Sequence, residues 1–210
     1  GIERWQSEGL DPEADFNEVF NYDPSPTYDF FNLGWCEAPF DPHFESKVLE
    51  DRGEHELVQD WAGRGVLVFK GRRSGFMPEY VDHPVKDMAT WVENCKWRLD
   101  PTTETRYTDE ANQIAGAKEA AATGHLVRQL LVGGYMYLRS LFGPVDLMYA
   151  WTDMPDVVHD CMQTWLAVAD HVSARVQEHV SFDEVFFAED ICYNHGLLCS
   201  PDMMREFLLP

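Results

Sequence analysis

The chain has 210 residues, of which 45% are hydrophobic and 13% aromatic, so it can bury a core as one domain or two small ones. Sixteen Lys and Arg residues oppose 37 Asp and Glu residues, which gives a formal net charge of -21. A field of that sign repels nucleic acid and anionic membrane surfaces. It also disfavours polyanionic substrates, unless the few arginines gather in one place.

Neither a bilayer-spanning run nor a signal-peptide pattern is present in the sequence, so a cytoplasmic location is expected. The five cysteines are an odd number scattered along the chain. In that compartment they predict reduced thiols rather than a disulfide framework.

Residues 1–100 form a loop-rich N-terminal segment in this interpretation. Within it, residues 44–70 alternate apolar and polar side chains, with turn signals at Arg52-Gly53 and at residues 62–65. This pattern predicts an inserted antiparallel β-meander of about three strands.

Residues 101–210 alternate between helical and strand patterns, which is typical of an α/β fold with a parallel sheet. Strands are expected near 126–134 and 183–190, and the second, short and apolar, should be buried on both faces. A long amphipathic helix from about 157 to 176 separates them.

Capping residues predict where three helices begin. Asp87, Asp153 and Ser200 each stand directly before a helical pattern and can accept a hydrogen bond from its first turn. Pro155 and Pro201 follow the second and third of these, in the first turn, where a missing N–H costs nothing.

Two adjacent acids, Glu189 and Asp190, stand where the last apolar run stops. Polar groups just beyond the carboxyl end of a parallel strand are where α/β folds usually bind ligands. Either acid could serve a site or cap the loop. Because strand side chains alternate between faces, the two should not both point inward.

The loop that follows contains Cys192, His195 and Cys199, spaced as C-x₂-H-x₃-C. Three such ligands could hold zinc together with a fourth group such as Asp190. We favour the alternative of two thiols and a solvent-exposed histidine, because structural zinc sites usually bring four clear ligands.

The second half, from RQLLVGGYMYLRSLFGPVDLMYAWTDMPDVVHDCMQ to DEVFFAEDICYNHGLLCSPDMMREFLLP, resembles the uroporphyrinogen decarboxylase superfamily. The branch related to corrinoid-dependent methyltransferases is the most similar, and IERWQSEGL and GRRSGFMPEYVDHPVKDMATWVENCKWRLDP resemble it too. The resemblance implies a (β/α)₈ TIM barrel of the uroporphyrinogen decarboxylase type. A complete barrel needs about 250 residues, so only its N-terminal part is expected in this chain.

The resemblance also implies roles for particular residues. Asp190 matches an acid that recurs at the end of this barrel strand and is the expected catalytic residue, which leaves Glu189 as the structural one. Tyr135 and Tyr137 follow a glycine-containing strand where the family places substrate-binding residues, although aromatic side chains equally often fill a barrel mouth.

Two further residues are candidates for the pocket wall. Arg139 is the nearest cation that could bind a carboxylate, or it could form an outward salt bridge. His195 is the other candidate.

In contrast, GRRSGFMPEY departs from the arginine segment R-Q-A-G-R-Y-L-P-E-Y of true decarboxylases. Arg72 and Arg73 do not reproduce its spacing, because Phe76 stands where the second arginine should be.

The function implied by the resemblance is a methyltransferase that moves a methyl group between a corrinoid and a thiol. In the family zinc activates the thiol, with ligands expected mainly from a later part of the barrel. The first alternative is a metal-independent decarboxylase of uroporphyrinogen or a related tetrapyrrole in porphyrin biosynthesis. The second is a non-catalytic domain that binds a corrinoid or a partner protein. An oligomer is compatible with each of them.

Overall fold

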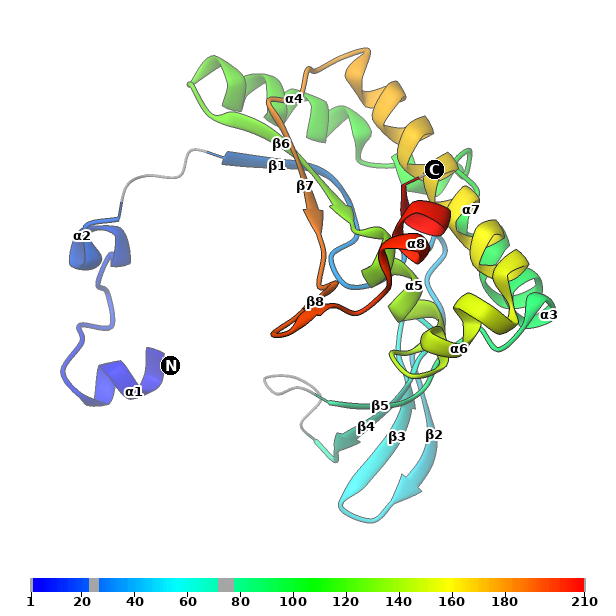
Figure 1. Cartoon of the computed structure of the whole chain (residues 1–210). Helices are drawn as coiled ribbons and strands as arrows, with labels where there is room; N and C mark the ends of the chain where they lie inside the picture. Colours follow the sequence, from blue (N-terminus) through cyan, green and yellow to red (C-terminus); the bar gives the residue numbers. More distant parts are fainter. Residues whose placement is uncertain (1, 23–26, 72–77, 210) are drawn as a thin grey trace.

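The structure is a computed structural model that describes residues 2–22, 27–71 and 78–209 (Figure 1). It is a mixed α/β fold with a three-stranded parallel sheet, a four-stranded antiparallel sheet and a small hairpin. The strands are β1 Thr27–Leu33, β2 Lys47–Arg52, β3 His55–Gln59, β4 Gly65–Phe69, β5 Glu79–Asp82, β6 Leu126–Val132, β7 Glu184–Ala188, β8 Cys192–Tyr193 and β9 Gly196–Leu197.

The helices are α1 Ile2–Ser7, α2 Phe16–Phe20, α3 Met88–Thr90, α4 Glu110–Ala122, α5 Gly134–Phe142, α6 Asp146–Asp153, α7 Pro155–Gln177 and α8 Pro201–Met203. Short π and 3₁₀ segments extend α3 and α8 and precede α4, at Trp91–Cys95, Lys96–Leu99, Glu104–Tyr107 and Met204–Leu208. No helix of the described segments is both long and apolar enough to cross a membrane.

The parallel sheet has the order β1-β6-β7, with β6 in the centre. The predicted strands near 126–134 and 183–190 are confirmed as β6 and β7. The expectation that β7 is buried on both faces is wrong, because Val185, Phe186 and Phe187 are 46%, 36% and 51% exposed. Within the described chain β7 is an edge strand with one neighbour, and apolar composition alone does not distinguish an edge strand from a central one.

Strand β1 lies in a segment that the sequence pattern assigned to loops. Its residues Phe30, Phe31 and Leu33 are buried in the core. Phe31 has a positive φ of 46°, and the register with β6 shifts between Phe30 and Leu33. This irregularity puts neighbouring residues on the buried side, so the alternation that identifies a strand is lost.

The predicted meander is confirmed and has one strand more than expected. Its order is β2-β3-β4-β5, all antiparallel, and its turns fall at Arg52-Gly53 and between β3 and β4. Gly53 has a φ of 78°, a conformation that glycine adopts without strain. Arg72, Arg73 and Phe76 lie outside the described residues, so the comparison of that segment with the decarboxylases stays a prediction.

Two of the three predicted caps are confirmed. Asp87 forms a capping box with Thr90, and the Ser200 hydroxyl accepts from the Met203 N–H at 3.1 Å. Asp153 does not cap α7, because α6 continues through it and Met154 is the residue before α7. Pro155 does begin α7, as predicted.

The main hydrophobic core of the described residues joins the two halves of the chain, and Val58, Val66 and Val68 of the meander form a second, smaller cluster. The main core includes Phe30 from β1, Trp91 after α3, Leu138 from α5 and Val172 from α7, each fully buried. Helices α5, α6 and α7 and the C-terminal segment gather beside the carboxyl end of β6 (Figure 1). Because these parts pack together, the segments that follow β1, β6 and β7 are held in fixed positions.

Candidate functional site

The three parallel strands end at the same edge of their sheet, so the segments that follow them are neighbours. Cys36 follows β1, helix α5 follows β6, and Glu189 and Asp190 follow β7. The candidate functional site is built from these segments and from the meander, whose strands β4 and β5 approach α5 (Figure 1).

Glu189 is a structural residue. Its carboxylate accepts hydrogen bonds from the backbone N–H of Tyr135 at 3.0 Å and of Met136 at 3.1 Å, in the first turn of α5. A negative charge there satisfies free N–H groups and complements the helix dipole. Gly133 is required beside it, since a Cβ at that position would overlap the carboxylate.

Asp190 points away from the α5 N-terminus and meets a cation. Its Oδ2 accepts from Arg139 Nη1 at 2.9 Å, and the side chains of Asp190 and Arg139 are 64% and 35% exposed. The two predicted site residues are therefore brought together, 51 positions apart in sequence. Their pairing makes Arg139 an ion-pair partner within the chain, and the catalytic role of Asp190 stays a prediction.

The two tyrosines lie inside the fold. Tyr137 is fully buried, and its hydroxyl donates to the Cys161 carbonyl at 3.1 Å, which joins α5 to α7. In this structure Tyr137 packs in the core, and its substrate-binding role stays a prediction. Tyr135 is 1% exposed, and burial is the main cause of its raised pKa. Both residues belong to α5, which begins at Gly134 and packs on the core, rather than to an open strand end.

The C-x₂-H-x₃-C residues lie around the β8–β9 hairpin and do not converge. Cys192 and His195 are exposed, whereas Cys199 is 6% exposed and burial, followed by Glu189, raises its pKa. The described part of the chain contains no group of three His, Cys, Asp or Glu side chains placed to hold a metal ion. These residues do not fit zinc, so no chemical step is derived through it.

A cavity of about 420 Å³ lies between the meander and α5. It is lined by Cys36, Arg64, Tyr80, His83, Arg139, Ser140 and Pro144, and we call it the arginine cavity. Of these residues only Arg139 is a candidate from the sequence. No spacing links the others, because they come from four separate parts of the chain.

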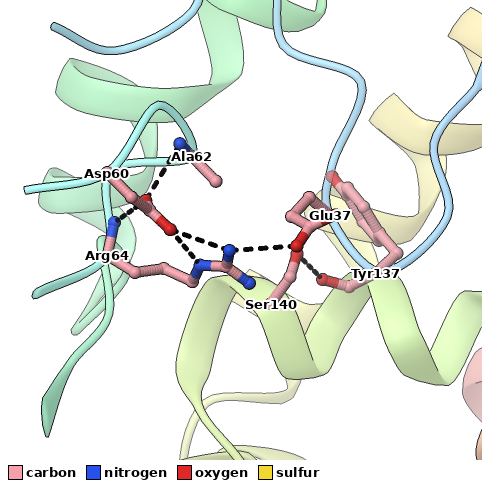
Figure 2. A network of polar contacts seen from close by, with 6 residues as sticks. All are labelled: Glu37, Asp60, Ala62, Arg64, Tyr137 and Ser140. Atoms are coloured by element: carbon pink, nitrogen blue, oxygen red, sulfur yellow. Dashed lines mark hydrogen bonds and ion pairs between the residues drawn. The ribbon is translucent and has the colours of Figure 1, made fainter. Parts of the chain in front are cut away.

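Arg64 is held in the cavity wall by the turn between β3 and β4 (Figure 2). Asp60 Oδ1 accepts from the N–H groups of Ala62 and Arg64, which closes the turn, and its Oδ2 accepts from Arg64 Nε at 2.8 Å. Glu37 accepts from Arg64 Nη2 at 3.0 Å. Burial lowers the pKa of Arg64, but the two carboxylates raise it by more, so the guanidinium stays charged.

Two other groups in the cavity are neutral near pH 7. Burial, followed by the charges of Lys86 and Arg64, lowers the pKa of His83 to about 4. Burial, followed by Glu37, raises the pKa of Cys36, so its thiol is protonated and is a weak nucleophile. The cavity therefore offers two permanent cations, a neutral imidazole and a neutral thiol.

Comparisons with protein-family models, with curated proteins and with solved structures find no match to this chain.

Proposed function

We propose that this chain forms part of a uroporphyrinogen-decarboxylase-like enzyme, and that the sheet β1-β6-β7 is the first part of its TIM barrel. The parallel pairing of three strands in chain order, with helices between β6 and β7, supports this assignment. The polar residues after the strands lie at the edge where barrel enzymes bind their substrates.

We further propose that the reaction is methyl transfer between a corrinoid and a thiol. The supporting observation is the Arg139–Asp190 ion pair beside the arginine cavity, at the carboxyl edge of the sheet. In this reaction the acceptor thiolate attacks the methyl carbon. The new S–C bond forms as the Co–C bond breaks, the electron pair stays on cobalt, and the thiol proton passes to solvent. Asp190 would hold Arg139 in position to orient the acceptor.

The test uses methylcobalamin as the methyl donor and 2-mercaptoethanol as the acceptor, with zinc salt in one arm and a chelator in the other. The proposal expects the methyl thioether by mass spectrometry and a matching loss of the methylcobalamin absorption band. Asp190→Ala should abolish turnover and leave the far-ultraviolet circular dichroism unchanged. Asp202→Ala, at a side chain 95% exposed, is the matched control. Full turnover by Asp190→Ala would remove Asp190 from the site.

Decarboxylation of a tetrapyrrole is the second candidate, favoured by the aspartate Asp190 that follows β7 at the carboxyl edge of the sheet. Loss of carbon dioxide from uroporphyrinogen in the presence of chelator, without methyl transfer, would replace the first proposal by this one. Corrinoid binding with neither reaction would instead support a non-catalytic domain.

A further inference from the structure

The arginine cavity differs in charge from the rest of this acidic chain. Its wall contains the guanidinium groups of Arg64 and Arg139 and no Asp or Glu side chain among the described residues. The larger neighbouring cavity, of about 650 Å³, has Glu37 and Asp41 in its wall. In a chain of net charge -21, a concave surface with two cations and no carboxylate is suited to an anion.

Arg64 provides a buried donor that faces this cavity. Its side chain is 9% exposed, with Nε and Nη2 held by Asp60 and Glu37. Nη1 has no hydrogen-bond partner among the described residues, and in Figure 2 no dashed line reaches it. A charged N–H group held rigidly without a protein acceptor is ready to donate to a ligand.

Arg139 supplies the second donor. Its Nη1 is engaged by Asp190, and within the described residues Nε and Nη2 have no hydrogen-bond partner. The carboxylates of Asp60, Glu37 and Asp190 are absent from the cavity wall. They hold the two arginines in place, and they also disfavour a ligand with several negative charges.

The rest of the wall sets the kind of molecule that fits. The Tyr80 ring, the Pro144 ring and the neutral His83 imidazole are flat or apolar surfaces. The volume of about 420 Å³ is in the range of sites for small organic ligands. We propose that the arginine cavity binds a small molecule with a single carboxylate on a flat apolar body, and that Arg64 Nη1 and Arg139 donate to this carboxylate. This inference goes beyond methyl transfer and does not depend on it.

Calorimetric titration with benzoate and with its uncharged isostere benzamide tests the proposal. Benzoate should bind at least about tenfold more tightly, because charge-assisted hydrogen bonds to arginine are lost in the amide. Arg139→Met should weaken benzoate binding about tenfold or more. The matched control Arg175→Met, which breaks a partly buried pair with Glu110 outside the cavity, should leave binding unchanged. Equal binding of the two probes, or no benzoate binding, would overturn the proposal.

Arg64→Met would leave Asp60 and Glu37 without their cation and is expected to disturb folding. Arg64→Lys is the better variant, since it keeps the charge and removes the Nη1 donor. It should also weaken benzoate binding.

Cys36 gives an independent measurement, because a ligand in the cavity should slow the alkylation of its thiol by iodoacetamide. Alkylation of the exposed Cys192 should be unchanged, and peptide mass mapping measures both rates. Unchanged alkylation of Cys36 at saturating benzoate would place the ligand elsewhere.

Discussion

At the residue scale, His83 shows how the fold changes the chemistry of a side chain. Its ring packs against Gly143, where a Cβ would lie 2.6 Å from Nδ1. Gly143 has a φ of 85°, so glycine is favoured there both for its backbone and for the space it leaves. The imidazole is held in a partly dry site beside two cations, and it resists protonation.

This shift predicts a pH dependence of stability. Below its ordinary pKa of 6.5, His83 takes up a proton in the unfolded chain, whereas in the folded chain it does so near 4. The unfolded state therefore binds more protons in this window, so the free energy of unfolding falls as the pH drops from about 6.5 to about 4. The loss should be roughly 1 to 2 kcal/mol after allowance for solvent screening of this partly exposed side chain.

Urea denaturation at several pH values measures the effect, with His83→Asn as the matched control of similar size. The slope of stability against pH should be smaller in the variant over that window. Identical slopes for both proteins would show that His83 is not the group responsible.

At the element scale, α5 depends on the acid that follows β7. Glu189→Ala removes the acceptor for the N–H groups of Tyr135 and Met136 and should lower the free energy of unfolding by about 1–2 kcal/mol. The adjacent Asp190→Ala removes an exposed ion pair and should cost less than about 1 kcal/mol. Equal losses in urea denaturation would contradict the assignment of Glu189 as the cap.

A second contact between elements joins α7 to the segment after α3. Asp160 accepts from Trp91 Nε1 at 2.6 Å and from Lys96 Nζ at 2.7 Å. Asp160→Ala should lower stability by about 2 kcal/mol, because the indole N–H of the fully buried Trp91 loses its acceptor. Asp170→Ala, an exposed acid on the same helix, should have little effect in thermal denaturation. A loss of similar size at Asp170 would mean that helix charge, not this contact, is responsible.

At the scale of the whole molecule, charge and uncovered apolar surface are the main features. A formal charge of -21 makes the folded chain repel itself. The β7 edge exposes aromatic residues, and Trp35 stacks on Phe186 with ring centroids 5.5 Å apart. Helices α1 and α2 have no buried residue, and the ring contacts of Trp5, Phe16 and Phe20 are made among themselves and with Tyr22.

Self-repulsion predicts that salt stabilises this protein. Raising the sodium chloride concentration shortens the distance over which like charges repel each other. It should therefore raise the melting temperature. Surface ion pairs act in the opposite direction, but each contributes about 1 kcal/mol or less. Circular dichroism melts at low and high salt measure the balance. A melting temperature that falls with salt would show that attractive pairs dominate.

Elements that depend on short-range patterns could be predicted from the residues alone. The strands β6 and β7, the meander, the caps at Asp87 and Ser200 and the different directions of the Glu189 and Asp190 side chains follow from periodicity, turn residues and alternation. Each of these signals acts over a few residues, so it does not depend on how the rest of the chain packs.

Three features could be seen only in the folded chain: β7 is an edge strand, β1 forms despite its broken register, and Tyr137 lies in the core. The arginine cavity is a fourth such feature. Its two arginines are held by distant carboxylates, since Arg64 binds Glu37, 27 positions away, and Arg139 binds Asp190, 51 positions away. Burial and ion pairing across such distances depend on how whole elements pack, which no local pattern of residues encodes.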